Sequence, residues 1–358
     1  MPGSATQFCP NTVQYALIPS QAPTKSTTLQ SKFCDIMHIT KFFRLLLFSL
    51  WGMMVFPLSD WGQSPPVRQF VTVASKKMCY TSSGLKDRKP GEPVIVFEAG
   101  FSTAGTLVFN TIFPAVTKIA PTVAYDRNAE GQSELDTTLT TDADIAKRLH
   151  ALLQAIHVLP PYVLIGHSMG GPYIRLFTAL YPKDVKALVF LDPTYFTLTD
   201  QQLATLTRIS PPGWDLGRSN IVNAAADSLL PPIQHYRYSR LLNTIYKNGY
   251  FREYASLPPL PNIPVAVLLA YNHHSPSRID STERQKQITM ANDTLNDFRI
   301  ENYKIMVGNN RDSFVMLLPG FKHFIYEQDP DLIISVIDRI YRKALRPSAP
   351  TQADMQNR

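Results

Sequence analysis

The stretch Gly166-His167-Ser168-Met169-Gly170-Gly171 decides how the chain is interpreted. It follows an apolar run at 162–165 and opens a segment of helical period, so it predicts a sharp turn from a strand into a helix. Such a turn presents its central serine at the carboxyl end of the strand, and it needs small residues two positions away on either side. We therefore predict that Ser168 is a nucleophile.

Strand-like and helix-like segments alternate from about residue 70 to residue 345. Apolar runs that read as strands occupy 94–97, 122–125, 162–165, 187–191, 265–270 and 313–318, after an antiparallel pair at 71–73 and 77–81. Segments of helical period occupy 142–156, 170–181 and 331–345, and Asp142 is placed to cap the first of them. Because continuous apolar runs suit strands covered on both faces, the predicted fold class is α/β, with a mostly parallel central sheet and helices on both faces.

Residues 195–263 interrupt this alternation. Proline pairs separate helix-like stretches that are rich in aromatic residues. We interpret the segment as a helical lid inserted into a core made of 70–194 and 264–345. Its aromatic side chains either receive an apolar substrate group or pack the lid onto the core, and they are Tyr236, Tyr238, Tyr246, Tyr250, Phe251 and Tyr254.

The two ends of the chain have a different composition. Residues 1–36 are predicted to be a polar, disordered extension, and 346–358 a polar tail. Residues 37–62 place basic residues before an apolar run at 45–58, a pattern typical of a signal peptide or a membrane anchor. The run is shorter than the ~20 residues of a spanning helix, and a poor cleavage site follows it. We predict a protein that is exported (periplasmic or secreted) or membrane-anchored, with Met37 as its start.

Composition limits the classes of function. The chain has 358 residues and a formal charge of +7. Its Lys and Arg residues are scattered, with no basic stretch that carries interleaved aromatics, so nucleic-acid binding is not expected. Cys9, Cys34 and Cys79 form neither a disulfide framework nor a cluster with metal-ligand spacing. We therefore expect no metal and no organic cofactor.

Several motifs together resemble the α/β-hydrolase fold superfamily, in particular serine esterases and lipases. The stretch around Ser168 is one of them. A second is Glu98-Ala99-Gly100-Phe101, which stands where members often carry His-Gly after the third strand. A third, Tyr125 to Ser133, is similar to the family's Asp-Arg loop, which is structural in most members. The resemblance covers about residues 70–345 and implies an oxyanion hole made by the backbone N–H groups of Phe101 and Met169.

A serine hydroxyl needs a base to take its proton. The resemblance implies His323, which follows the last predicted strand in a Gly-x-x-His setting just before the last helix. The acid of the triad is less determined, because the residues after the 265–270 strand include no carboxylate before Asp280. We favour Asp192, at the end of the preceding strand, over Asp280. Asn272 could orient the imidazole instead, although it would stabilise the imidazolium less than a carboxylate does.

These residues predict acyl transfer to water through an acyl-enzyme on Ser168. A carboxylic ester with an apolar group is the expected small-molecule substrate, and peptidase chemistry on the same triad is a neighbouring alternative. Two other classes stay open: a non-catalytic binding module on this fold and a cofactor-free oxidative enzyme. A serine nucleophile argues against the dehalogenase and epoxide-hydrolase branches of the superfamily, which use an aspartate.

Overall fold

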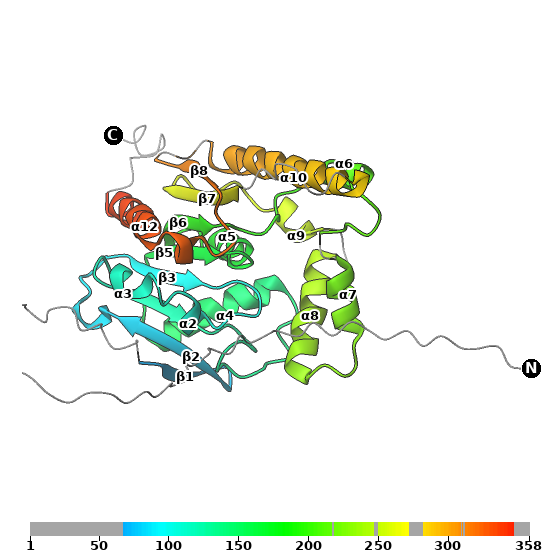
Figure 1. The fold of residues 1–358 in the computed structure, drawn as a ribbon. Helices are drawn as coiled ribbons and strands as arrows, with labels where there is room; N and C mark the ends of the chain where they lie inside the picture. Colours follow the sequence, from blue (N-terminus) through cyan, green and yellow to red (C-terminus); the bar gives the residue numbers. More distant parts are fainter. Residues whose placement is uncertain are drawn as a thin grey trace, which may run out of the picture. The chain divides into compact units, whose positions relative to one another are not determined.

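The apolar runs of the sequence form one eight-stranded sheet (Figure 1). The strands are β1 (Gln69–Val73), β2 (Lys76–Ser83), β3 (Val94–Glu98), β4 (Thr122–Tyr125), β5 (Tyr162–His167), β6 (Val185–Leu191), β7 (Val265–Tyr271) and β8 (Phe314–Pro319). Their order in the sheet is β1-β2-β4-β3-β5-β6-β7-β8. Strand β2 is antiparallel to both β1 and β4, and the remaining neighbours are parallel. The predicted fold class is therefore confirmed.

The computed structural model describes residues 67–216, 218–246, 250–271, 282–308, 310 and 312–346. The predicted extension, the predicted leader with its apolar run, and residues 347–358 lie outside this part of the chain. Export and membrane attachment therefore stay predictions. No helix within the described ranges is both long enough and apolar enough to cross a membrane.

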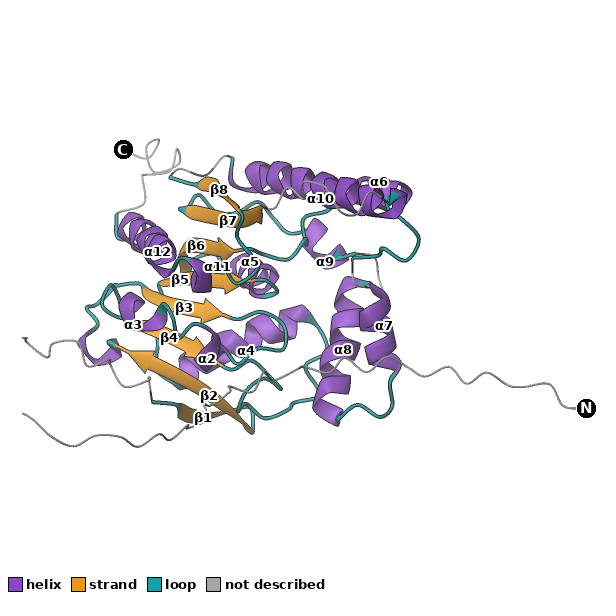
Figure 2. Ribbon diagram, in the orientation of Figure 1, coloured by secondary structure: helices purple, strands orange, loops and turns teal. Residues whose placement is uncertain are grey.

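Helices cover both faces of the sheet (Figure 2). They are α2 (Gly105–Val108), α3 (Phe113–Val116), α4 (Asp142–Ala155), α5 (Gly170–Leu180), α6 (Asp200–Ile209), α7 (Arg218–Ala226), α8 (Pro232–Ile245), α9 (Arg252–Ala255), α10 (Glu283–Val307), α11 (Ile325–Gln328) and α12 (Pro330–Ala344), with a 3-10 turn at Leu85–Asp87. One apolar core joins the sheet to α4, α5 and parts of α8, α9 and α10. A second core joins the other face to α3, α11 and α12.

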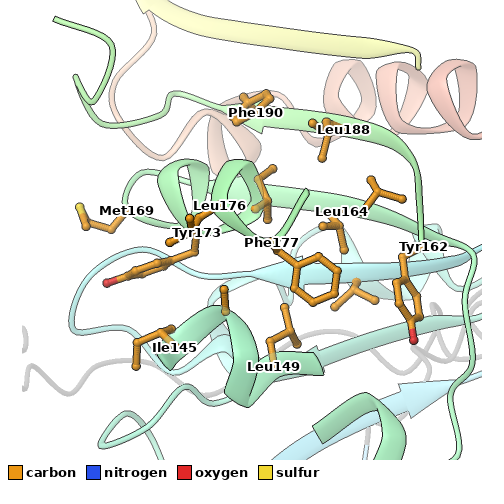
Figure 3. Packing of buried hydrophobic residues seen from close by; sticks show 14 of the residues in the cluster. Ile145, Leu149, Tyr162, Leu164, Met169, Tyr173, Leu176, Phe177, Leu188 and Phe190 are labelled. Carbon is orange, nitrogen blue, oxygen red and sulfur yellow. The ribbon is translucent and has the colours of Figure 1, made fainter. Parts of the chain in front are cut away.

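The packing of helix α5 against α4 holds the predicted nucleophile in position. Tyr173 and Phe177, one helical turn apart, are buried against Ile145 and Leu149 of α4 (Figure 3). Side chains four residues apart lie on one face of a helix, so this face holds α5 against its neighbours. Fully burying one such side chain contributes about 1.5–3 kcal/mol. The turn at Ser168 is thus fixed between a central strand and a well-packed helix.

The segment predicted as a lid forms α6, α7, α8 and α9 between β6 and β7. We call residues 195–263 the insertion. Figure 1 shows α7 and α8 side by side beyond the carboxyl ends of the strands. Its helical character agrees with the prediction, whereas its role as a lid stays a prediction.

Asp142 was expected to cap α4, and this expectation was wrong. Thr141 is the N-cap, and it forms a capping box with Asp144. Asp142 is the first residue of the helix, and its carboxylate turns toward the insertion. It accepts hydrogen bonds from Arg240 Nη1 (2.6 Å), Tyr254 OH (2.7 Å) and Thr244 Oγ1 (3.0 Å). The carboxylate is fully buried, so it ties the insertion to the core instead of satisfying the helix end.

Candidate active site

The register of the sheet brings the predicted site residues to one edge. Glu98 on β3 lies opposite Gly166 on β5, and His167 lies opposite Leu191 on β6. The segments that follow these three strands therefore leave the sheet at the same level. The first carries residues 99–104, which we call the Gly100 loop, the second carries Ser168, and the third carries Asp192.

Ser168 occupies a strained turn between β5 and α5. Its φ angle is +54°, in the left-handed region that costs a residue with a Cβ about 1–2 kcal/mol. A Cβ at Gly166 would lie 2.5 Å from the carbonyl oxygen of Gly170, and a Cβ at Gly170 would lie 2.1 Å from that of Glu98. Both glycines are therefore required by close backbone approach, as the sequence pattern predicted. The turn keeps the side chain of Ser168 at the edge, where it is partly exposed.

The loop after β3 lies directly against Ser168. A Cβ at Gly100 would be 3.2 Å from the Cβ of Ser168. Phe101 follows in this loop, and Met169 is the N-cap residue of α5, where backbone N–H groups have no acceptor within their own helix. Of the two residues predicted to form the oxyanion hole, Phe101 thus follows the glycine that lies against Ser168, and Met169 directly follows Ser168.

A buried arginine braces the Gly100 loop from behind. Arg127 donates to Glu98 Oε1 and to the carbonyl of Ala99, each at 2.6 Å, and to the carbonyl of Gly100 at 2.5 Å. Tyr125 also donates a hydrogen bond to Glu98. Burial raises the pKa of Glu98, although Arg127 and the hydrogen bonds oppose the rise. Arg127 thus fixes the carbonyls of Ala99 and Gly100, and with them the direction of the N–H groups of Gly100 and Phe101, which share their peptide planes.

His323 and Asp192 are in contact. His323 follows β8, and its Nδ1 lies 2.7 Å from Oδ2 of Asp192, at the end of β6. Asp192 is 6% exposed, whereas the side chain of His323 is 48% exposed. Nδ1–H donates to this carboxylate when Nε2 is free to accept a proton. The alternatives Asp280 and Asn272 lie outside the described residues.

The other oxygen of Asp192 is held from two sides. Its Oδ1 accepts a hydrogen bond from Arg299 Nη2 at 2.5 Å and from the backbone N–H of Ala270 at 3.1 Å. Burial alone would raise the pKa of Asp192, but the hydrogen bond with His323 and the charge of Arg299 outweigh it and hold this pKa below its ordinary value. Asp192 is therefore a carboxylate at neutral pH.

Arg299 is a site residue that the sequence did not reveal. It comes from α10, a helix that was not predicted, and it is 5% exposed. Its guanidinium also lies over the ring of Tyr195, 5.1 Å from the ring centroid. The weak signal was a four-residue spacing of the positions that α10 buries, which includes Leu295, Arg299 and Tyr303.

His167 links the serine turn to the segment that carries His323. Its Nε2 lies 3.1 Å from the carbonyl oxygen of His323, and the two rings are 4.7 Å apart between centroids. Burial, together with the nearby charge of His323, lowers the pKa of His167 to about 4. At neutral pH His167 is therefore uncharged, and its Nε2–H can donate to that carbonyl.

Most aromatic residues of the insertion pack or anchor it. Tyr236 OH donates to the carbonyl of Leu139 at 2.6 Å, and Phe251 and Tyr254 are buried. Tyr238 contacts a residue of the candidate site, with its ring centroid 5.4 Å from that of Phe101. The packing role therefore accounts for most of these side chains. No group of His, Cys, Asp and Glu within the described ranges has the geometry of a metal site.

Comparison with known proteins gives the same class of fold. A family model described as the alpha/beta hydrolase fold matches residues 93–226, which run from the start of β3 to the end of α7. The solved haloalkane dehalogenase DatA from Agrobacterium tumefaciens C58 has a TM-score of 0.51 and 15% identity, over 78% of this chain and 98% of that one. At this identity the likeness concerns the fold alone. The chain has the α/β-hydrolase fold.

Two curated relatives match shorter parts of the chain. The Bacillus subtilis protein YqjL is 31% identical over 99 residues, which cover 28% of this chain and 39% of that protein. The human (lyso)-N-acylphosphatidylethanolamine lipase is 25% identical over 205 residues, which cover 51% of this chain and 59% of that protein. The chain is thus matched over less than two thirds of the length of either relative.

Proposed function

We propose that this protein is a serine hydrolase that cleaves carboxylic esters through an acyl-enzyme on Ser168. The observation that carries the proposal is the common position of three parts. Ser168 lies in a strained turn at the edge of the sheet, the Gly100 loop lies against it, and the hydrogen-bonded pair of His323 and Asp192 lies beside His167. A strained serine without these neighbours would support only a structural turn.

In the proposed reaction, His323 Nε2 takes the proton of Ser168 Oγ as Oγ attacks the carbonyl carbon of the ester. The backbone N–H groups of Phe101 and Met169 stabilise the negative oxygen of the tetrahedral intermediate. His323 then gives its proton to the leaving alcohol, and an ester of Ser168 remains. Water attacks this ester with the same histidine as base, which releases the carboxylic acid and restores the serine. Asp192 stabilises the imidazolium in both halves of the reaction.

Three observations support an ester with an apolar group as the substrate. The nucleophile is a serine, which supports an acyl intermediate and not the alkyl intermediate of an aspartate nucleophile. The human relative is named a lipase, and lipases cleave acyl esters. Tyr238 and Phe101, in edge contact at the site, offer an apolar surface for an acyl or alcohol group.

Labelling with a fluorophosphonate tests the proposal, because only an activated serine reacts with it. We expect one label at Ser168, located by mass spectrometry, that disappears after heat denaturation. Ser168→Ala should lose the label and lower the hydrolysis of p-nitrophenyl esters by at least about 10⁴-fold while the protein stays folded. Ser335→Ala, an exposed serine on α12, is the matched control and should behave as the natural protein. Full ester hydrolysis by Ser168→Ala would refute the proposal.

A further inference from the structure

A cavity of about 950 Å³ lies between the core and the insertion. Its walls come from α5, α8, α9 and the segment after β6, and Arg175, Phe196, Tyr250, Phe251 and Tyr254 are among the residues that line it. Neither Ser168 nor His323 lines it. We call it the insertion cavity. It is a space of ligand size that the proposed hydrolysis does not use.

Arg175 is the unusual residue of the insertion cavity. Its side chain is 7% exposed, and its Nη2 donates to the carbonyl of Pro258. Its Nη1 is buried and has no hydrogen-bond partner within the described part of the chain. Burial lowers the pKa of Arg175 to about 10, and no charged group among the described residues opposes the fall. The group is still protonated at neutral pH, so a positive charge is buried with one hydrogen-bonded carbonyl, that of Pro258, in the part of the chain that the structure describes.

Three other buried arginines among the described residues each pair with a carboxylate. Arg240 pairs with Asp142, Arg148 with Asp136 and Arg299 with Asp192, each within 2.6 Å. A buried cation without a counterion carries a desolvation cost of several kcal/mol. The described residues supply a carboxylate to each of these arginines and none to Arg175, which leaves Arg175 able to take a counterion from outside the chain.

The remaining charges of the cavity wall define the charge of this anion. Asp142 is neutralised by Arg240, and Arg252 pairs with Asp200 at 3.2 Å. Glu253 is the other acidic residue of the wall. Burial, followed by the charges of Asp142 and Asp144 and opposed by Arg240, raises the pKa of Glu253 to about 7. Arg175 thus offers one positive charge, and Glu253 adds a negative charge when it is ionised. This balance favours a ligand with one negative charge over a ligand with two.

The apolar part of the wall defines the body of the ligand. Phe196, Phe251 and Tyr254 pack ring against ring, with centroids 5.5–6.5 Å apart, and all three line the cavity. Leu198 and Met306 extend the same surface. Aromatic and aliphatic surface of this kind stabilises an apolar group by about 25 cal/mol for each Å² that it covers.

We propose that the insertion cavity is a binding site for an organic monocarboxylate, whose carboxylate pairs with Arg175 and whose apolar body lies against the aromatic wall. The site is separate from Ser168. It does not depend on the proposed hydrolysis.

Calorimetric titration with 3-phenylpropionate tests the site, with 3-phenylpropan-1-ol as the neutral counterpart and inorganic phosphate as the anion without an apolar body. We expect the carboxylate to bind at least about ten-fold more tightly than either of the others. Arg175→Met should weaken it by about ten-fold or more, whereas Arg252→Met, at an exposed cation of the same wall, should change it less than about two-fold. Equal binding of the alcohol, or unchanged binding by Arg175→Met, would overturn the proposal.

Two further measurements cover the remaining outcomes. Ser168→Ala and protein labelled with a fluorophosphonate should bind 3-phenylpropionate as the natural protein does, and loss of binding after labelling would place the ligand at Ser168 and refute a separate site. Glu253→Gln should strengthen binding at about pH 8, where Glu253 is ionised, and leave it unchanged at about pH 6. This variant keeps Arg175, so it tests the site even if Arg175→Met does not fold. No strengthening would count against the site.

Discussion

Two buried carboxylates of this protein each pair with a buried arginine and differ in their other partners. Asp142 and Asp192 each accept a hydrogen bond from an arginine about one hundred residues away in sequence, Arg240 and Arg299 respectively. The aromatic partner of the carboxylate differs between the two. It is the buried Tyr254 for Asp142, but the half-exposed His323 for Asp192. A buried ion pair is thus a structural element of both regions, and the proposed chemical role of Asp192 depends on the half-exposed histidine attached to it.

Asp192→Asn should have the largest effect. It keeps the shape of the side chain but no longer stabilises a protonated His323, and we expect the kcat of ester hydrolysis to fall by about 10⁴-fold. Asp142→Asn is the matched variant and should retain kcat within about ten-fold, because its carboxylate contacts no site residue. Steady-state rates with p-nitrophenyl esters measure both. Equal losses would remove the distinction between the two carboxylates.

The same two variants should cost similar stability. Each leaves a buried arginine without its counterion, which typically costs about 3–5 kcal/mol. Urea denaturation at neutral pH should therefore give two similar losses in the free energy of unfolding. The double variant Asp192→Asn/Arg299→Met removes both charges and should regain part of that stability without regaining activity. If only Asp192→Asn lowered the free energy of unfolding, the pairing of Arg240 with Asp142 would not be needed for stability.

His167 gives the Asp192 region a sensitivity to acid. Its pKa is near 4 in the folded protein and about 6.5 when unfolded. The unfolded chain therefore binds the proton first, so this stabilisation is fully present above about pH 6.5 and is lost as the pH falls toward 4. The lost stability amounts to about 3 kcal/mol. Urea denaturation of His167→Gln across this range should show a flatter pH dependence, and an unchanged slope would contradict the assignment.

Arg299 should have a smaller effect, visible in the pH profile. Its charge opposes protonation of the base, so Arg299→Met should move the acidic midpoint of kcat/KM up by about half a unit to one unit. Arg299→Lys keeps the charge and should keep the midpoint, and Arg284→Met removes a cation from the exposed start of the same helix and should also keep it. A uniform loss of rate without a shift would indicate that Arg299 only positions Asp192.

Some elements could be read from the sequence because their signals are local. The apolar runs of β3, β5 and β6 are continuous, since both faces of these strands are covered, and the glycines around Ser168 are required by backbone contacts within a few residues. The predicted acid, Asp192, lies beside His323, but its role waits for the rate measurements. The arginines could not be predicted in the same way. Arg299 and Arg240 act on partners 107 and 98 residues away, and no local pattern records such a pairing.

Helix α10 was missed for a related reason. It buries an arginine and a tyrosine, Arg299 and Tyr303, among its apolar residues, so its inner face does not read as an apolar stripe. The capping of α4 was misassigned because Thr141 and Asp142 are adjacent and both suit an N-cap. The two residues differ in that the carboxylate of Asp142 bonds the insertion, which leaves Thr141 as the N-cap.

During synthesis of the chain, the partners of Asp142 are complete before those of Asp192. Every side-chain partner of Asp142 named above has been synthesised by residue 254, whereas the partners of Asp192 begin at Ala270 and end at His323. A nascent chain can therefore form the contacts between Asp142 and the insertion before it can form those of Asp192 with Arg299 and His323. Premature termination between residues 254 and 323 therefore yields a chain that holds Ser168 and lacks His323, the proposed base.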